Sequence, residues 1–584
     1  MVSAPIQLQH FLIIIPKKVR DRNWYDGILN ECTSDLKYAT PESGYGYFVT
    51  PRKKTVNRSS YSKPEVMVCG DDQDFDRNKP DAWLGNGIVI RFFETGLEIF
   101  SSLTGLPPVY QFEDSHYIIF SDTIQAISSL SFVNLHFNRE AIVEMGLIGK
   151  PINYKTLFNE ILLIPAGKRI EFSGNGVVKQ SGEWQPDIRE YTRQQEYMDE
   201  VIAAFESAII RIDTSPSFLS LTAGLDSRAI LSNLLKHNKA IPCVTITGRK
   251  ETLDSMRARQ LCEYYDIRHY PVVIGNEFEK ELPRLSLLAS LHTGGLSSID
   301  QAVEIYFNEF TEKLFASRVS GNLGNQIGRS GTEGTGERAA SMVAFNDEYI
   351  RLADVFDSRH WFYKVNHTDD LLSASFILQQ ENLFAQLGNY SIGHHYLNQQ
   401  TPYADKNVIN LKFSEPIHVD NVRTIRDIKI RDLKHRILGQ SVGQSFQSRI
   451  VEQAGGKIMQ VPINWGWRVK GFYTPESLFQ GGKALVDMLL SQRIERIPGC
   501  AKLLDIVGIE GFSGFQKANY TDSQSMQEFI KDTFSSQRIR ECNLFNPVFI
   551  QAILWPDKNY HIDQKETILA LDIALSMATF SVQT

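Results

Sequence analysis

Apolar residues follow two different patterns along this chain. Up to about residue 190 they form short runs, or alternate with polar residues, between Gly, Pro, Asp and Ser. Such runs predict β-strands joined by tight turns. They occur at residues 11–15, 88–92, 97–100, 109–112 and 117–120. The polar and charged stretch 51–81 predicts instead a long exposed loop.

From about residue 191 onward, strand-like runs alternate with apolar residues at helical spacing. Strands are predicted at residues 218–221, 242–247, 270–274 and 313–319, and helices at 197–212, 228–236, 252–262 and in the tail 481–584. This repetition indicates a parallel α/β sheet whose ligand lies at the carboxyl ends of the strands. We therefore expect an α/β protein with two domains, a β-rich layered domain at residues 1–190 and a parallel-sheet domain with a helical tail at 191–584.

Length and composition are typical of a soluble protein with more than one domain. The chain has 584 residues, of which 42% are hydrophobic and 22% are charged. A net charge of -7 argues against a nucleic-acid partner, and no apolar run approaches the roughly 20 residues that span a bilayer. The six cysteines contain no CxxC pair and are typical of reduced thiols. We expect a cytoplasmic protein without nucleic-acid or membrane partners.

The clearest candidate for chemistry is the small-residue turn between the predicted strand 218–221 and the predicted helix 228–236. Backbone N–H groups, the hydroxyls of Thr222 and Ser227 and a helix N-terminus surround one concavity there, which suits a phosphate. Asp226 would repel that phosphate unless a cation such as Mg²⁺ bridges them. The alternative is an ordinary turn in which Ser227 or Asp226 only caps the helix.

The turn also resembles a known motif. Thr-Ala-Gly-Leu-Asp-Ser-Arg at 222–228 is similar to the Ser-Gly-Gly-Leu-Asp-Ser pyrophosphate loop of the asparagine synthase family of ATP pyrophosphatases. The resemblance implies ATP and Mg²⁺ as cofactors, with Asp226 as a metal ligand and catalytic residue. It implies a nucleotide site formed by Leu221, Thr222, Ala223, Gly224, Leu225, Ser227, Arg228, Thr245, Thr247, Gly321 and Asn322.

A second glycine-rich loop, residues 319–331, resembles the Ser-Gly-Glu-Gly-Ala-Asp-Glu loop of the same family. Ser320 and Gly321 match it. Asn322, Asn325 and Gln326 stand where the family has acids, so Asn325 is a weakened candidate for a second metal ligand. Glu333 and Glu337 lie just downstream as possible substitutes or as ordinary solvated side chains.

Two later segments carry further resemblance. Residues 467–472 are similar to the Arg-x-Lys-x-Gly-Phe region of the family, which makes Lys470 the catalytic candidate that stabilises developing charge. The alternative is a surface lysine. Residues 399–405 resemble an architectural phrase of the family. His394 and His395 have no carboxylate at ligand spacing, so satisfied polar histidines are expected there and not a metal site.

The first domain resembles the glutaminase domain of asparagine synthases at residues 103–110, 119–122 and 156–167. In glutamine-using members a cysteine follows the initiator methionine, because its α-amino group acts as the base for its own thiolate. Val2 occupies that position here. The resemblance therefore implies an inactive N-terminal-nucleophile-like domain, as in β-lactam synthetases and lasso-peptide cyclases.

The resemblance implies an AMP-forming carbon–nitrogen ligase that makes an amide bond through an acyl-adenylate. Its substrate would be a small molecule or peptide that carries both a carboxylate and an amine, and glutamine would not be used. The alternative is a nucleotide-binding or regulatory protein that lost the chemistry, which the amides at 322, 325 and 326 favour. The sequence identifies neither the substrate, nor the base for the amine, nor the oligomeric state.

Overall fold

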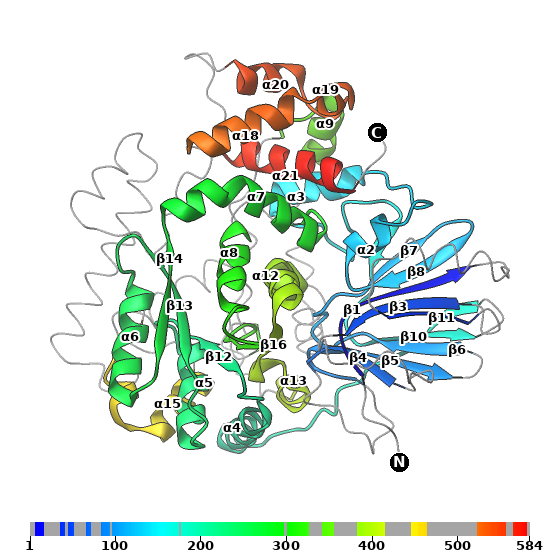
Figure 1. Cartoon of the computed structure of the whole chain (residues 1–584). Coiled ribbons are helices and arrows are strands. Elements are labelled where there is room, and N and C mark those ends of the chain that lie inside the picture. Colours follow the sequence, from blue (N-terminus) through cyan, green and yellow to red (C-terminus); the bar gives the residue numbers. More distant parts are fainter. Residues whose placement is uncertain are drawn as a thin grey trace.

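The computed structural model of the chain describes residues 6–16, 36–40, 45–51, 66–71, 83–93, 96–173, 177–296, 301–324, 326–327, 342–355, 382–414, 445–463, 523–555 and 564–580. These residues contain an 11-stranded mixed sheet and a five-stranded parallel sheet with helices around it. Figure 1 shows the two sheets side by side, with the mixed sheet in blue and cyan. The α/β class expected from the sequence is confirmed.

The mixed sheet is built around its first strand, β1 (Ile6–Pro16). The other strands are β2 (Leu36–Thr40), β3 (Tyr45–Pro51), β4 (Val66–Gly70), β5 (Gly87–Phe93), β6 (Gly96–Phe100), β7 (Tyr110–Glu113), β8 (Tyr117–Ser121), β9 (Ile161–Leu163), β10 (Lys168–Ser173) and β11 (Val177–Glu183). β1 pairs antiparallel with β3 and β8 and parallel with β4. We call this sheet, with the short helices α2 (Ile124–Ser128) and α3 (Arg139–Ile148), the layered part.

Strand β1 is buried on both faces, and its side chains alternate between two cores. Phe11 and Ile13 pack among apolar residues of β4, β5, β6 and β10, whereas Leu12 and Ile14 belong to the large core that extends into the helices. β1 therefore joins the layered part to the rest of the molecule. The strand predicted at 11–15 is confirmed and is longer than expected.

The long exposed loop predicted at 51–81 is wrong in part, because it contains β4. Residues 67–70 of this strand are buried, and β4 pairs with both β1 and β5. Its apolar residues form a run of only four, Val66 to Cys69, within charged surroundings. The pattern was too short to outweigh the flanking polarity, and tertiary pairing decides the structure.

The second sheet has the strand order β14-β13-β12-β15-β16, and all its pairs are parallel. Its strands are β12 (Ser217–Ser220), β13 (Cys243–Gly248), β14 (His269–Ile274), β15 (Ser317–Val319) and β16 (Asn398–Gln400). The strand predicted at 313–319 is shorter than expected. The N–H groups of Leu314 and Phe315 return to the Thr311 carbonyl, so this stretch closes the preceding helix before β15 begins.

Helices lie around the parallel sheet and continue into the tail (Figure 1). They are α4 (Gln194–Arg211), α5 (Leu225–Lys236), α6 (Leu253–Tyr265), α7 (Asn276–Thr293), α8 (Ala302–Thr311), α9 (Asp347–Val355), α12 (Asn382–Tyr396), α13 (Lys406–Lys412), α15 (Ser445–Ala454), α18 (Gln524–Ser535), α19 (Gln537–Glu541), α20 (Pro547–Leu554) and α21 (Gln564–Phe580). We call these helices and their sheet the parallel-sheet part. α21 contacts α7 and α18 of this part and also α3 of the layered part.

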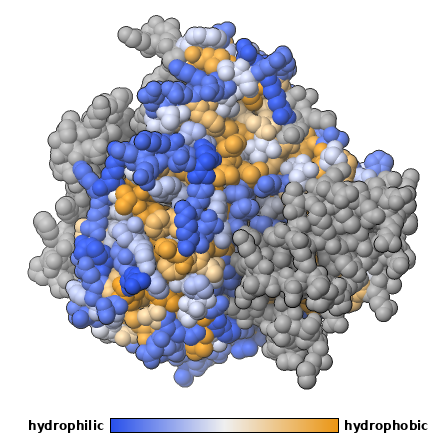
Figure 2. All heavy atoms as spheres, viewed as in Figure 1, coloured by the Kyte–Doolittle hydropathy of each residue, from blue (hydrophilic) through white to orange (hydrophobic). Residues whose placement is uncertain are grey.

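The surface of the parallel-sheet part is mixed. Figure 2 shows patches of hydrophobic residues among hydrophilic ones on this face, and Leu253, Val273 and Leu287 are among the exposed apolar side chains. In the described ranges, no helix combines the length and the apolarity that crossing a membrane requires.

Candidate functional site

The candidate phosphate loop, residues 221–224, joins β12 to α5 at the carboxyl edge of the parallel sheet. Gly224 is the N-cap of α5, and no side chain caps this helix. The alternative that Ser227 or Asp226 is only a helix cap therefore does not describe this turn. The first N–H groups of α5 have no cap side chain as acceptor, which is the condition for anion binding at a helix N-terminus.

Two hydroxyls shape the loop from within. The Thr222 N–H donates to Ser227 Oγ at 3.1 Å, and the Gly224 N–H donates to Thr222 Oγ1 at 3.2 Å. The two hydroxyl oxygens lie 3.2 Å apart. The loop is therefore folded into a compact ring by the same side chains that the sequence proposes as phosphate ligands.

A third N–H of the loop already donates to a carboxylate. The Ala223 N–H donates to Asp254 Oδ1 at 2.7 Å. Asp254 lies in the first turn of α6, whose N-cap Thr252 accepts from the Ser255 N–H as the sequence predicts. Burial raises the pKa of Asp254, while the hydrogen bond from Ala223 acts in the opposite direction. One amide of the loop thus holds a carboxylate oxygen of the protein itself, and no pattern in the sequence indicates this contact.

The second glycine-rich loop lies directly against Asp226. A Cβ added to Gly324 would be 2.6 Å from Asp226 Cγ, and one added to Gly321 would be 3.0 Å from Asp226 Cβ. Only glycine allows such an approach without displacing the carboxylate. Residues 321 and 324 of this loop therefore lie against the start of α5, and a contact of the loop with a nucleotide stays a prediction.

Two residues that are not among the predicted site residues, Gln447 and Tyr403, also contact Asp226. Gln447 of α15 donates through Nε2 to Asp226 Oδ1 at 3.0 Å and to the Gly324 carbonyl at 3.1 Å. The Tyr403 hydroxyl donates to the Asp226 carbonyl at 3.1 Å. Gln447 shares its helix face with the buried residues Ile450 and Val451, so a polar residue at an apolar helical position was the available signal.

Several buried polar atoms near the two loops have no hydrogen-bond partner within the described structure. They are Gln447 Oε1 and both side-chain polar atoms of Gln326. Both side chains are fully buried. An unpaired buried polar atom costs about 1–3 kcal/mol, so these atoms would gain from contact with a further group.

These side chains fit the expected Mg²⁺ ion in their chemistry. Asp226 supplies a carboxylate and Gln447 supplies an amide oxygen that lacks a partner, and both are hard oxygen ligands of the kind that Mg²⁺ binds. Asp254 of α6 brings a second carboxylate against the phosphate loop, where it accepts from the Ala223 N–H.

The remaining predicted nucleotide ligands mostly serve the framework in this structure. Thr245 Oγ1 donates to the Leu221 carbonyl at 2.7 Å, and Thr247 Oγ1 accepts from the Thr252 N–H at 3.2 Å. The Asn322 carbonyl accepts from the Thr401 hydroxyl at 2.8 Å, and Leu225 is buried at the start of α5. Their contacts with a nucleotide stay predictions.

Arg228 is turned toward the backbone and is fully buried. Its guanidinium donates to the carbonyls of Val461, Pro462 and Ala223, the last two at 3.0 and 3.3 Å. Burial, together with the nearby Arg257, lowers the pKa of Arg228 to about 9. The side chain therefore fastens the segment after α15 to the phosphate loop, and a nucleotide contact of Arg228 stays a prediction.

Several predictions lie outside the described residues. They concern Val2, Asn325, Glu333, Glu337, Lys470 and the segment 467–472.

A large cavity in the described structure lies elsewhere. It has a volume of about 1160 Å³ and is lined by the start of α3, by α9 and by residues 542–547, with no residue of either loop. This cavity therefore does not support a ligand site at the two loops. The support for a site there is their hydrogen bonding and their close approach to Asp226.

No known protein family matches the sequence, and no curated protein matches it either. Among solved structures, the chain is similar to an NMN synthetase from Francisella tularensis, with 11% sequence identity and a TM-score of 0.18, over 45% of this chain and 93% of the other. So low a TM-score carries no argument about fold or function. The function has to be argued from the residues of this chain.

Proposed function

We propose that this protein is an ATP-dependent, AMP-forming ligase of the asparagine synthase type that makes an amide bond. One observation carries the proposal: two glycine-containing loops at the carboxyl edge of a parallel sheet meet around Asp226. The carboxyl edge is the usual ligand side of such sheets. The unpaired amide atoms of Gln326 and Gln447 beside these loops support a bound ligand.

The proposed reaction has two steps. A substrate carboxylate oxygen attacks the α-phosphorus of ATP, an O–P bond forms, and the bond to pyrophosphate breaks. An amine of the same substrate then attacks the acyl carbon, the bond to AMP breaks, and the amine loses a proton. Mg²⁺, when bound, would neutralise the charge of the phosphates. In this proposal glutamine is not used, because Val2 replaces the cysteine that its hydrolysis needs.

In this proposal different residues of the chain bind the pyrophosphate, bind the cation and stabilise the developing charge. The N–H groups of the phosphate loop and the hydroxyls of Thr222 and Ser227 hold the departing pyrophosphate. Asp226 and Gln447 hold the cation in place. Lys470 would stabilise charge in both steps, as the resemblance of residues 467–472 implies.

ATP binding tests the proposal first. Titration calorimetry with ATP and Mg²⁺ would compare the wild-type protein with Asp226→Asn, and Asp199→Asn on the exposed face of α4 serves as a matched control. We expect Asp226→Asn to weaken binding at least about tenfold, since one ionic ligand is worth more than 1.4 kcal/mol. Equal affinity in all three proteins would overturn the assignment of the loop.

Turnover tests the chemistry. Carboxylate–amine compounds are added with ATP, and release of pyrophosphate and AMP is measured. We expect stimulated release in the wild type and in Asp199→Asn, and at least about a hundredfold less in Asp226→Asn. Release of ADP and phosphate would contradict the proposed reaction class.

A nucleotide-binding protein without chemistry is the second candidate. The amides of Asn322 and Gln326 favour it, because an amide neither neutralises a cation nor accepts an amine proton. Tight ATP binding that depends on Asp226, together with no pyrophosphate release across a broad substrate panel, would favour this candidate.

A further inference from the structure

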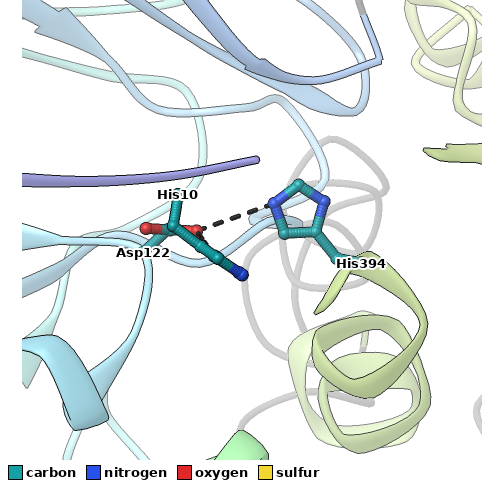
Figure 3. Close-up of side chains that lie close together, drawn as sticks. All are labelled: His10, Asp122 and His394. Carbon is teal, nitrogen blue, oxygen red and sulfur yellow. Dashed lines mark hydrogen bonds and ion pairs between the residues drawn. The ribbon is translucent and has the colours of Figure 1, made fainter. Parts of the chain in front are cut away.

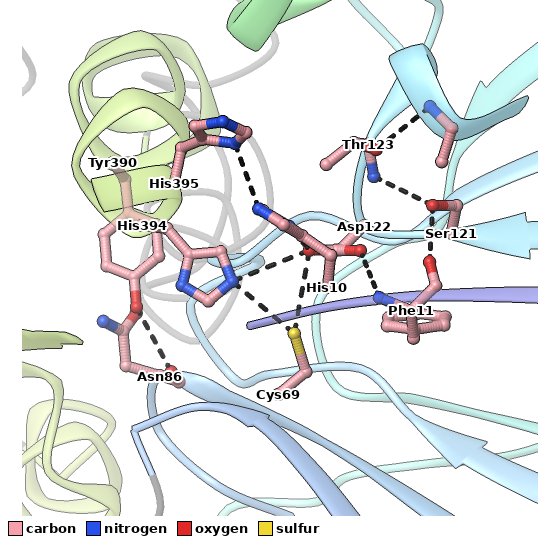
Figure 4. Close-up of polar contacts among 11 residues, drawn as sticks. His10, Phe11, Cys69, Asn86, Ser121, Asp122, Thr123, Tyr390, His394 and His395 are labelled. Atoms are coloured by element: carbon pink, nitrogen blue, oxygen red, sulfur yellow. Dashed lines mark hydrogen bonds and ion pairs between the residues drawn. The ribbon is translucent and has the colours of Figure 1, made fainter. Parts of the chain in front are cut away.

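A second convergence of polar side chains lies where the layered part meets α12. It brings together His10 of β1, Cys69 of β4, Asp122 directly after β8, and His394 near the end of α12 (Figures 3 and 4). Cys69, Asp122 and His394 are buried, and His10 is partly buried. The four residues come from widely separated segments, so their spacing in the sequence does not predict that they lie together.

The other three side chains surround the carboxylate of Asp122. Asp122 Oδ2 lies 2.7 Å from His10 Nδ1, 3.6 Å from His394 Nε2 and 3.7 Å from Cys69 Sγ. Cys69 Sγ lies 3.5 Å from His394 Nε2. The potential ligand atoms of His10, Asp122 and His394 all lie within 4.8 Å of one another.

These separations are close to those of a tetrahedral zinc site. Zn–S bonds of about 2.3 Å and Zn–N or Zn–O bonds of about 2.0–2.1 Å place neighbouring ligand atoms roughly 3.3–3.6 Å apart. The three separations among Cys69, Asp122 and His394 are 3.5, 3.6 and 3.7 Å. The pair of His10 and Asp122 is at hydrogen-bond distance and would have to open by roughly half an ångström. The His10 ring would also have to move toward Cys69, because Cys69 lies outside the group whose ligand atoms all fall within 4.8 Å of one another.

The same geometry argues against a nucleophilic triad. In a triad the base uses one ring nitrogen for the nucleophile and the other for the carboxylate. Here Cys69 and Asp122 both approach Nε2 of His394. Cys69 is also fully buried, so a substrate has no access to its sulfur. A thiol and a carboxylate that face the same ring nitrogen are placed as metal ligands are, and not as the members of a triad.

We propose that Cys69, Asp122, His394 and His10 bind one structural Zn²⁺ ion that fastens the layered part to α12. A thiolate, a carboxylate and two neutral imidazoles carry a total charge of about −2, which balances Zn²⁺, and the mixture of sulfur and nitrogen ligands is typical of zinc. The thiol proton of Cys69 passes to solvent when the ion binds. Four protein ligands close the site, as in structural zinc centres.

A surrounding shell holds the proposed ligands in position. The Phe11 N–H donates to the other carboxylate oxygen, Asp122 Oδ1, at 2.9 Å. His10 Nε2 lies 3.0 Å from Nδ1 of His395 (Figure 4). The ring of His395 is tilted against that of His292 of α7, with the two ring centroids 3.8 Å apart. Such outer contacts orient metal ligands. The contact between His395 and His292 also connects α12 with α7.

Metal content of the purified full-length protein tests the proposal. We expect about one zinc per chain in the wild type, and less than about a tenth of that in Cys69→Ala and His394→Ala. Cys243→Ala, at a buried thiol of β13, and His136→Ala, at an exposed imidazole, are the matched controls and should keep the zinc. Zinc that survives both Cys69→Ala and His394→Ala would overturn the proposal.

A readout on the wild-type protein does not depend on how the variants fold. The zinc is removed with a chelator, which should lower Tm by several degrees, and Co²⁺ is then added. A tetrahedral site with one thiolate should give strong ligand-field absorption and a sulfur-to-cobalt charge-transfer band at one equivalent. Wild-type protein that contains no zinc and gives no such bands would also overturn the proposal, whatever its activity with ATP.

Discussion

The carboxylate of Asp254 accepts a hydrogen bond from the phosphate loop, but burying its charge opposes folding. Burial raises the pKa of this carboxyl, which means that folding disfavours its charged form relative to the unfolded chain. The stabilising contribution of such a group is fully present below the unfolded pKa of about 3.9 and is lost as pH rises through the folded pKa. Asp254 therefore opposes folding at neutral pH, although its hydrogen bond with Ala223 orders the phosphate loop.

The substitution Asp254→Asn keeps the oxygen that accepts from Ala223 and removes the charge. We expect the variant to be more stable than the wild type at pH 7, and the difference to shrink to nothing below about pH 4. Urea unfolding measured from pH 3.5 to 8 checks this expectation. A variant that is less stable than the wild type at pH 7 would mean that the carboxylate is stabilised by a charge partner.

Single residues also show where sequence reasoning ends. Thr222, Ser227 and Asp226 could be recognised because seven consecutive residues carry the motif. Gln447 and Tyr403 could not, because they reach Asp226 from helices 221 and 177 residues away. The same holds for Asp122, which supplies to His394 the carboxylate that local spacing does not offer.

At the scale of elements, strands were predictable where apolar runs were clean. β5, β6 and β8 lie within one residue of their predicted bounds. β4 was hidden because its four apolar residues stand in charged surroundings, and β15 was overestimated because the turn after α8 is also apolar. Pairing partners, which sequence periodicity does not name, decide both cases.

The approach of the two glycine-containing loops gives a prediction at this scale. Gly324→Ala places a methyl group 2.6 Å from Asp226 Cγ, so the loops have to separate. We expect a loss of about 1–3 kcal/mol in the free energy of unfolding and at least about tenfold weaker ATP binding. Denaturant titration and calorimetry measure the two effects.

Gly182→Ala is the matched control for this change. A Cβ at Gly182 would meet only side-chain atoms of Arg169 at 3.7 Å, an ordinary contact far along the chain from the loops. ATP affinity that is unchanged in Gly324→Ala would show that the spacing of the loops does not matter for the nucleotide.

At the scale of the whole molecule, helix α21 is a second element, besides β1, that connects the layered part with the parallel-sheet part. It contacts α3 of the layered part and both α7 and α18 of the parallel-sheet part, and residues 571–577 are all buried. A helix that is buried all round belongs to the core of a large protein. The last helix in the chain is thus as central as β1, the first strand.

Two alanines of α21 allow a test of its role in the core, because one is buried and the other is exposed. Ala574 is fully buried, whereas Ala578, one turn later, is exposed. We expect Ala574→Asp to destabilise the protein by at least about 3 kcal/mol, because a charge is buried without a partner, and Ala578→Asp to change stability by about 0.5 kcal/mol or less. Thermal unfolding of the two variants checks this, and equal Tm values would show that α21 is not part of the cooperative core.

The hydrogen bond between Ala223 and Asp254 has a consequence for selectivity. A carboxylate that is part of the chain acts as a tethered competitor, with an effective concentration on the order of millimolar or higher at the loop. Free phosphate or sulfate has to displace it without any compensating charge. A nucleotide that arrives with its own cation can instead share that cation with the carboxylate, so the loop would discriminate against simple anions by competition within the molecule.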